Sequence, residues 1–259
     1  MKKIAAIIQA RMGSSRLPGK VLMDICGEPM LAWVVKRTRF AKLIDEIIVA
    51  TTEEKIDDPI EKFCQANKIA CFRGSSADVL DRYYQAAKIY QADVIVRLTA
   101  DCPLIDPELI DNTIAAFLSS NVDFVANRLP PPYQRSYPIG LDVEVVSMAA
   151  LERAWKESTA LYEREHVFPF IYEKKGRFKI VILDNDVDYG EHRWTVDTQE
   201  DLNFIQAVAN KLNCRMNFSW KEIIALLDKY PDLKQINAEV RHKSFTDVDA
   251  RVEVKMKKK

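Results

Sequence analysis

The residue types with the clearest chemistry gather near the start of the chain, in the segment QARMGSSRLPGK over 9–20. Its two glycines let backbone N–H groups approach an anion closely, and its two serines add hydroxyl donors. Three cations, Arg11, Arg16 and Lys20, match the charge of a polyphosphate. The segment therefore predicts a phosphate-binding loop with solvated cationic side chains.

Two familiar phosphate-binding motifs do not fit this segment. The loop of P-loop nucleotide triphosphatases, G-x-x-x-x-G-K-[ST], needs four residues between its glycines and a hydroxyl after its lysine. Here five residues separate Gly13 from Gly19, and Val21 follows Lys20. The dinucleotide-binding pattern G-x-G-x-x-G is absent from the sequence. A kinase-type site and a dinucleotide site are therefore disfavoured.

Two carboxylates lie where apolar strands are expected to end. Asp101 follows the stretch Asp93–Leu98, and Asp197 follows His192–Val196. Ligands of open α/β sheets bind beyond the carboxyl ends of the strands, and Mg²⁺ is commonly held by one or two carboxylates together with phosphates. Each residue also has a structural alternative, since Asp101 could be a turn residue and Asp197 the N-cap of the next helix.

Other polar residues carry weaker signals. The acidic cluster DNDVD over 184–188 could hold a metal ion on a nucleotide-sugar, but its place between two expected strands favours a solvated turn. Asp142 and Glu144 lie two apart on an expected strand and so face the same side. With Glu165 and His166 they are candidates for the lining of an acceptor pocket, although a lone histidine is more often structural.

The elements that would position these residues alternate along the first half of the chain. Continuous apolar stretches, typical of buried parallel strands, are separated by segments with helical apolar spacing. The expected strands are Ile4–Ala10, Glu46–Thr51, Ile69–Phe72, Asp93–Leu98 and Val122–Ala126, and the expected helices are Met30–Lys42, 58–67, Ser76–Gln91 (capped by Ser75 or Ser76) and Pro107–Ser119. This alternation predicts an α/β fold with a mostly parallel sheet covered by helices on both faces.

The pattern changes after residue 128, where the segment Leu129–Pro138 carries four prolines and must be irregular. Further strands are expected over Leu141–Val146, Phe178–Leu183 and His192–Val196, and further helices over Ala149–Trp155, Tyr162–Lys174, Gln199–Leu212 and Trp220–Lys229. We expect a single domain over 1–240, with a lobe inserted at about 128–175, and a basic C-terminal tail over 241–259.

The composition excludes several classes of protein. With 259 residues and 48% hydrophobic content, the chain can bury a substantial core, which excludes intrinsic disorder as its main state. Lys and Arg number 38, as do Asp and Glu, so a surface that coats nucleic acid is disfavoured. The sequence contains no apolar run of the ~18–20 residues that a membrane-spanning helix needs.

The cysteines indicate the redox compartment. The five are scattered, none forms a CxxC pair, and there are only three histidines. This pattern disfavours both a disulfide framework and a zinc site. We therefore expect a reduced, cytoplasmic protein.

Together the motifs resemble those of CMP-sugar synthetases, the 3-deoxy-manno-octulosonate and acylneuraminate cytidylyltransferases, and above all the spore-coat polysaccharide branch of that family. The likeness begins in the loop, at Ala10-Arg11 and at SRLPGK over 15–20, and covers about residues 1–210. It continues through residues 72–83, 97–104, 140–145, 164–166 and 193–198. It implies a three-layer Rossmann-like nucleotide-diphospho-sugar transferase fold.

This resemblance implies a Mg²⁺-dependent cytidylyltransferase that transfers CMP from CTP to a hydroxyl of an acidic sugar and releases pyrophosphate, for surface polysaccharide or glycan biosynthesis. Asp101 and Asp197 would jointly hold Mg²⁺, and Arg11, Arg16 and Lys20 would act with them in catalysis. The implied nucleotide-binding residues are Ala10, Arg11, Gly13, Ser14, Ser15, Arg16, Lys20, Arg73 and Thr99. The resemblance also implies a homodimer formed through the inserted lobe. Two other classes stay open, a glycosyltransferase and a non-catalytic nucleotide-binding protein.

Overall fold

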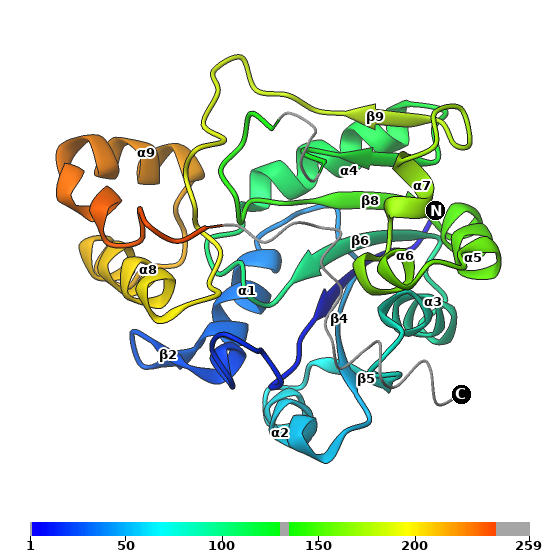
Figure 1. The fold of residues 1–259 in the computed structure, drawn as a ribbon, viewed down its shortest axis with the longest axis horizontal. Coiled ribbons are helices and arrows are strands. Elements are labelled where there is room, and N and C mark those ends of the chain that lie inside the picture. Colours follow the sequence, from blue (N-terminus) through cyan, green and yellow to red (C-terminus); the bar gives the residue numbers. More distant parts are fainter. Residues whose placement is uncertain (1, 130–134, 242–259) are drawn as a thin grey trace.

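A computed structural model of the chain describes residues 2–129 and 135–241; the centre of the proline-rich segment and most of the expected basic tail lie outside the described residues. Its main feature is a seven-stranded sheet of order β5-β4-β1-β6-β8-β7-β9 (Figure 1). Within the described ranges, no helix has the length and apolar character needed to cross a membrane.

The sheet is mostly parallel, as the sequence predicts. Its parallel half consists of β1 (Ile4–Gln9), β4 (Glu46–Thr52), β5 (Ala70–Gly74) and β6 (Val94–Thr99). The other half adds β7 (Phe124–Ala126), β8 (Glu144–Ser147) and β9 (Ile180–Ile182). Of these, β8 runs antiparallel between β6 and β7, and β9 pairs parallel with β7.

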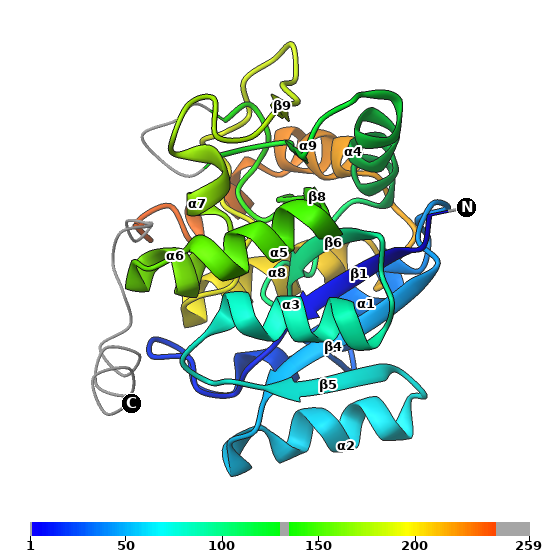
Figure 2. The ribbon, with the colours of Figure 1, turned by 90° about the vertical axis from the view of Figure 1, so that its right-hand side faces the viewer.

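Helices cover both faces of the sheet, because successive strand residues point to opposite sides. Ala5 and Ile7 of β1 belong to one buried core, and Ala6 and Ile8 belong to the other. The first face carries α3 (Val79–Ile89), α5 (Met148–Glu157), α6 (Leu161–His166) and α7 (Pro169–Tyr172). The second face carries α1 (Met30–Thr38), α2 (Asp58–Ala66) and α4 (Pro107–Ser119). Figure 2 shows these layers, which confirm the three-layer expectation.

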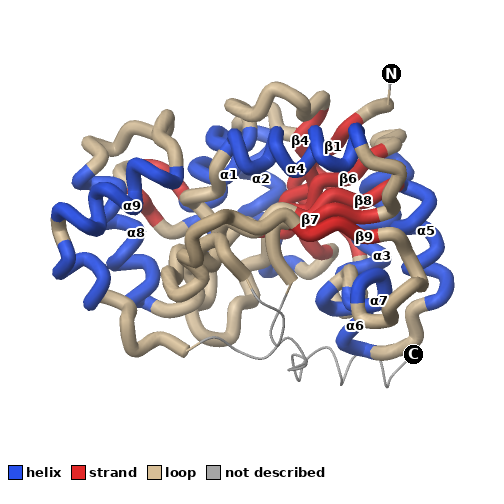
Figure 3. The backbone as a smooth tube through the Cα atoms, turned by 90° about the horizontal axis from the view of Figure 1, so that it is seen from above, coloured by secondary structure: helices blue, strands red, loops and turns tan. Residues whose placement is uncertain are grey.

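A third core lies beyond the end of the sheet, built around Trp33 and Trp194. It joins α8 (Gln199–Lys211) and α9 (Trp220–Lys229) to a short hairpin of β2 (Asp24–Ile25) and β3 (Glu28–Pro29). Figure 3 shows α8 and α9 at the opposite end of the molecule from α5–α7. Three single-turn 3₁₀ helices complete the described elements: η1 (Lys20–Leu22), η2 (Lys55–Asp57) and η3 (Pro231–Gln235).

Several predicted elements need correction. The stretch His192–Val196 is a loop rather than a strand, with one isolated bridge between Ile139 and Arg193. The expected helix Tyr162–Lys174 is divided, because Val167 takes a positive φ of 75° and ends α6 before Pro169 begins α7. The strand predicted at Leu141–Val146 begins only at Glu144.

The cap of α3 was also predicted wrongly. Asp78, rather than Ser75 or Ser76, precedes the helix, and its carboxylate accepts the N–H of Asp81. The segment expected as an inserted lobe contributes β8 to the sheet and α5–α7 to the face that α3 covers. The lobe is thereby continuous with the main core through its apolar side chains.

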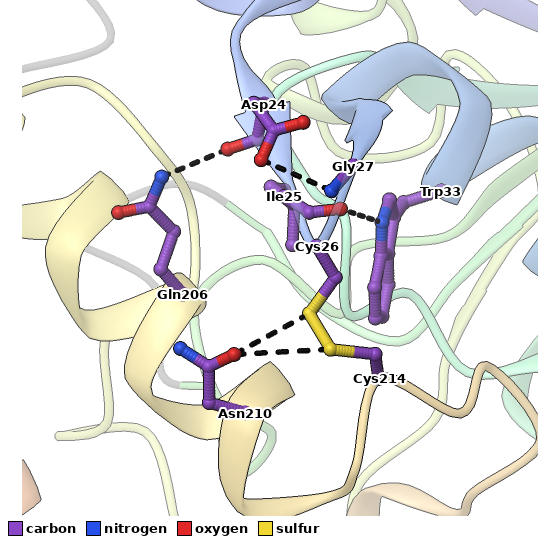
Figure 4. Close-up of a disulfide and its surroundings, with 8 residues drawn as sticks. All are labelled: Asp24, Ile25, Cys26, Gly27, Trp33, Gln206, Asn210 and Cys214. Carbon is purple, nitrogen blue, oxygen red and sulfur yellow. Dashed lines mark hydrogen bonds between the residues drawn. A yellow bond between two sulfur atoms is a disulfide. The ribbon is translucent and has the colours of Figure 1, made fainter.

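The expectation of a reduced protein is wrong for one pair of cysteines, because Cys26 and Cys214 are bonded with a Cα–Cα distance of 5.9 Å (Figure 4). The other three cysteines are free thiols, so the single bond is not a disulfide framework. Cys26 lies in the β2–β3 turn and Cys214 follows the end of α8. The hairpin docks on α8, where Gln206 donates a hydrogen bond to the Asp24 carbonyl. A separation of 188 residues gives no local sequence signal for such a pair.

Breaking this crosslink with Cys26→Ser is expected to lower the free energy of unfolding by about 2–5 kcal/mol, because the bond closes a very long loop in the unfolded chain. Urea denaturation of the variant and of the unreduced wild type measures the difference. A Cys71→Ser variant is the control, because Cys71 is a free thiol. Five titratable thiols in denatured, unreduced wild-type protein would contradict the assignment.

Candidate active site

The loop after β1 is folded on itself around Met12. The Met12 carbonyl accepts the N–H groups of Ser14 at 2.9 Å and Gly19 at 2.8 Å, and the Met12 N–H donates to Asp57 Oδ1 at 2.6 Å. Gly19 has a left-handed φ of 74°, which is accessible to glycine at little cost, and η1 begins at the next residue. This turn directs Lys20 back toward the sheet, as its Pro-Gly neighbours predict.

Lys20 joins the two candidate metal ligands. Its ammonium donates to Asp101 Oδ2 at 2.8 Å, to Asp197 Oδ1 at 2.9 Å and to the Val196 carbonyl at 2.6 Å. The residue is only 7% exposed, so the prediction of a solvated cation is wrong for Lys20. Burial alone would lower the pKa of Lys20, but the carboxylates of Asp101 and Asp197 outweigh it and raise that pKa above its usual value.

The other oxygen of Asp197 contacts two guanidinium groups. Asp197 Oδ2 lies 2.8 Å from Arg16 and 2.7 Å from Arg193. Burial alone would raise the pKa of Asp197, but Lys20, Arg16 and Arg193 lower it far below its usual range. The N-cap of α8 is Thr198, so the alternative role of Asp197 as a helix cap is wrong.

Asp201 holds Asp197 in place, and the sequence reasoning missed it. This fully buried carboxylate accepts the N–H groups of Asp197 at 2.9 Å and Thr198 at 3.1 Å. It also pairs with Arg193 at 2.9 Å and accepts from Asn237 at 2.9 Å. The spacing of Arg193, Asp197 and Asp201, four residues apart in turn, was the available signal.

Backbone contacts bring the two halves of the site together. The N–H of Val196 donates to the Asp101 carbonyl at 2.8 Å, and the Thr195 hydroxyl donates to the same carbonyl at 3.2 Å. Segments 95 residues apart are thereby joined beyond the carboxyl end of β6. The end of the stretch His192–Val196 is therefore held against Asp101 and is not paired as a strand of the sheet.

The pair of carboxylates is suited to a hard divalent cation. Asp101 and Asp197 each direct an oxygen at one position, which the Lys20 ammonium marks as a place for positive charge. Among residues 2–129 and 135–241 no group of three or more His, Cys, Asp or Glu side chains could hold a metal ion. A site with two carboxylates fits Mg²⁺, which takes its remaining ligands from phosphates and water.

The remaining loop residues form a positively charged rim. Arg11 lies near the buried Arg82, whose pKa is lowered to about 10 by burial and by Arg11 despite the opposing Tyr83. Ser14 Oγ accepts the Leu17 N–H at 3.4 Å, and Ser15 is exposed. Gly13 is half-buried in the same turn. Arg11 therefore adds a half-buried guanidinium group to the cations of the loop.

Of the other predicted nucleotide-binding residues, Ala10 and Thr99 lie at the ends of β1 and β6, next to this loop, whereas Arg73 lies on the edge strand β5. Ala10 is buried at the end of β1, where its N–H donates to the Ala50 carbonyl. Thr99 ends β6 beside Gln9. Arg73 is committed to the edge of the sheet, since its guanidinium lies 2.8 Å from Asp58 and 2.7 Å from Glu61 of α2.

The predicted acceptor-pocket residues separate into two places. Glu144 is 3% exposed and ion-paired with Arg97, so its carboxylate joins β8 to β6. Asp142 lies 3.3 Å from Arg128 and 3.4 Å from Arg135, two arginines that the sequence reasoning missed. Glu165 and His166 end α6, which is tied to the start of α3 by the ion pair of Arg164 with Asp78. The contacts described place Asp142 and Glu144 at the start of β8 and Glu165 and His166 at the end of α6, and a shared acceptor pocket stays a prediction.

Comparison with known proteins agrees with this geometry. A family model described as cytidylyltransferase matches residues 5–245. An uncharacterized protein of Methanocaldococcus jannaschii is 40% identical over 95% of this chain and 99% of its own length. The spore coat polysaccharide biosynthesis protein SpsF of Bacillus subtilis is 35% identical over 90% of this chain and 97% of its own length.

A solved structure gives the same result. A cytidylyltransferase from Leptospira borgpetersenii serovar Hardjo-bovis superposes with a TM-score of 0.86 and is 36% identical, covering 93% of this chain and 100% of its own. The phosphate loop, the parallel sheet and the carboxylates beyond it therefore belong to a nucleotidyltransferase, and this chain is a member of the cytidylyltransferase family.

Proposed function

We propose that the protein transfers CMP from CTP to a hydroxyl of an acidic sugar in a Mg²⁺-dependent reaction that releases pyrophosphate. The observation that carries this proposal is the convergence of Asp101 and Asp197 on one cation position below a phosphate-type loop. In the reaction, the acceptor oxygen forms a bond to the α-phosphorus of CTP, the bond to pyrophosphate breaks, and the hydroxyl proton is released. Surface polysaccharide or glycan biosynthesis is the proposed use of the product.

The chain's own residues would act by binding and positioning, which dominate catalysis of phosphoryl-group transfer. Arg11, Arg16 and Lys20 would hold the β- and γ-phosphates and stabilise the leaving pyrophosphate. Asp101 and Asp197 would hold Mg²⁺, which when bound supplies charge neutralisation at the phosphates. Arg193 and Asp201 would keep the Asp197 carboxylate in position.

The charge of the acceptor side supports an acidic sugar. Asp142 is paired with both Arg128 and Arg135, and Glu144, which also acts on Arg128, is already ion-paired with Arg97, so the arginines outnumber the carboxylates. Burial and the nearby carboxylates of Asp101 and Asp142 raise the pKa of the Cys102 thiol. Asp142 therefore lies on the same side of the site as the candidate metal ligand Asp101. A sugar carboxylate would complete the charge balance of these two guanidinium groups.

The glycosyltransferase alternative depends on the acidic cluster over 184–188. Asp184 Oδ1 accepts a hydrogen bond from Ser136, and Asp188 Oδ1 accepts the Gly190 N–H at 2.7 Å. The Asp188 contact is that of a local turn, and the Ser136 contact ties Asp184 to a distant part of the chain, so both carboxylates are engaged within the protein. A glycosyltransferase would also have no need of the three cations in the loop, so we favour CMP transfer.

Thermal shifts test the choice of nucleotide. CTP is expected to raise the melting temperature more than equal concentrations of ATP, GTP or UTP, because tighter binding to the native state stabilises it more. Differential scanning fluorimetry with Mg²⁺ present measures each shift. Equal or larger shifts with a purine nucleotide would remove the cytidylyl assignment.

A cytoplasmic homodimer completes the proposal. A CTP-dependent enzyme needs the nucleotide pool of the cytoplasm, and the segment from about 128 to 175 is the proposed dimer interface. Light scattering at micromolar concentration is expected to give twice the monomer mass of 29.7 kDa. A mass equal to the monomer would contradict the dimer.

A further inference from the structure

Lys20 uses its full hydrogen-bonding capacity inside the candidate metal site. An ammonium group has three donors, and this one has three acceptors, at Asp101 Oδ2, Asp197 Oδ1 and the Val196 carbonyl, all within 2.9 Å. The side chain is 9% exposed, against 28% for Asp101 and 19% for Asp197. The ammonium therefore lies between the carboxylates and is more deeply buried than either.

A divalent cation held by the same two carboxylates would compete with this ammonium. Two cations cannot share oxygens of Asp101 and Asp197 at close range, because like charges a few ångströms apart repel strongly in a partly buried site. Nor can Lys20 contact phosphates while all three of its donors are engaged. Lys20 must therefore change partners for a metal to bind and for a phosphate to be held.

We propose that Lys20 is a built-in counter-ion that occupies the cation position of Asp101 and Asp197 in the metal-free protein and excludes a divalent cation until phosphates draw the ammonium away. The first part concerns this chain alone; the role of phosphates rests on the proposed function. Metal and nucleotide binding are then coupled through one side chain. The protein binds the metal poorly alone and well together with a polyphosphate.

Arg16 and Arg193 can keep their contacts with Asp197 when the side chain of Lys20 moves away. Arg16 and Arg193 both contact Oδ2 of Asp197, which leaves Oδ1 to Lys20. Arg193 is held in turn by Asp201. Lys20, by contrast, starts a single 3₁₀ turn directly after the left-handed Gly19. Withdrawal of its side chain would leave one oxygen of each carboxylate facing the vacated position.

Nucleotide-free metal binding tests this proposal. Mn²⁺ binding, followed by electron paramagnetic resonance of the free ion, is expected to be at least tenfold tighter for Lys20→Met than for wild type. Arg16→Met is the matched control, because it removes one positive charge from Asp197 without vacating the position shared with Asp101. Its gain is expected to be clearly smaller. Equal gains in the two variants, or none for Lys20→Met, would overturn the proposal.

A second measurement uses the wild type, in case Lys20→Met does not fold. Without metal, acylation of Lys20 by acetic anhydride, read by peptide mass spectrometry, is expected to be slower than that of Lys36, whose side chain is 43% exposed. Saturating Mn²⁺ is expected to accelerate acylation of Lys20 and leave Lys36 unchanged. Unchanged protection of Lys20 would overturn the proposal. Neither measurement uses CTP or turnover, so its failure is distinct from failure of the proposed function.

Discussion

Asp197→Asn is expected to reduce turnover by about 10²–10³-fold while the fold is preserved. An amide is a poor ligand for a hard divalent cation, and it removes the charge that faces Lys20, Arg16 and Arg193. The helix that follows keeps its own cap at Thr198, so the loss is not a loss of helix stability. Pyrophosphate release and the melting temperature, measured together, separate the two effects.

A matched pair of substitutions controls this prediction. Asp101→Asn is expected to have an effect of the same size, because Asp101 shares the cation position. Asp188→Asn makes the same chemical change in the acidic turn and is expected to leave turnover unchanged, because that carboxylate bonds only locally in the contacts described. Near wild-type turnover of Asp197→Asn would show that this carboxylate is structural.

Lys20→Ala is expected to lower kcat and to raise KM for CTP, with kcat/KM falling by about 10²-fold. Contacts to the leaving pyrophosphate strengthen as charge builds on it in the transition state, so their loss affects the chemical step as well as binding. Steady-state kinetics at varied CTP concentration measures both constants. Arg16→Ala is expected to act in the same direction.

Lys20 is buried and Lys36 is partly exposed, and this difference decides both the choice of control and the expected stability of the Lys20 variant. Lys36→Ala removes a partly exposed lysine paired with Glu28 and is expected to leave the kinetics unchanged. Lys20→Ala leaves two half-buried carboxylates without their shared partner, so some loss of stability is expected and kinetics should be measured well below its melting temperature. An unchanged kcat with a raised KM would make Lys20 a docking residue only.

The sequence predicted those strands and helices whose formation depends on neighbouring residues. Continuous apolar stretches located β1, β4 and β6, and the helix expected over Pro107–Ser119 has the same bounds as α4. The turn that directs Lys20 inward forms at Gly19, whose left-handed φ is accessible to glycine at little cost. The family likeness added Asp101 and Asp197, which the fold brings to one cation position.

The sequence could not show which side chains neutralise one another. In the sequence Lys20 is one of three cations in a polar loop. It is buried in the structure because the fold brings Asp197, 177 residues away, into contact with it. Asp201 and Asn237 read as surface residues, and only the packing of η3 against α8 buries them beside Arg193. The crosslink of Cys26 to Cys214 likewise depends on the docking of the β2–β3 hairpin on α8. Such long-range pairs have no local pattern.

The most direct test of the central claim is pyrophosphate release from CTP. The purified protein is incubated with CTP, Mg²⁺ and acidic sugars such as 3-deoxy-manno-octulosonate and N-acetylneuraminate, with neutral sugars as controls. We predict release of pyrophosphate that depends on an acidic sugar and on Mg²⁺, with an equal amount of a CMP-sugar formed. Release of pyrophosphate that does not depend on any sugar would contradict the account, and so would consumption of a nucleotide-sugar donor in a parallel incubation that contains such a donor in place of CTP.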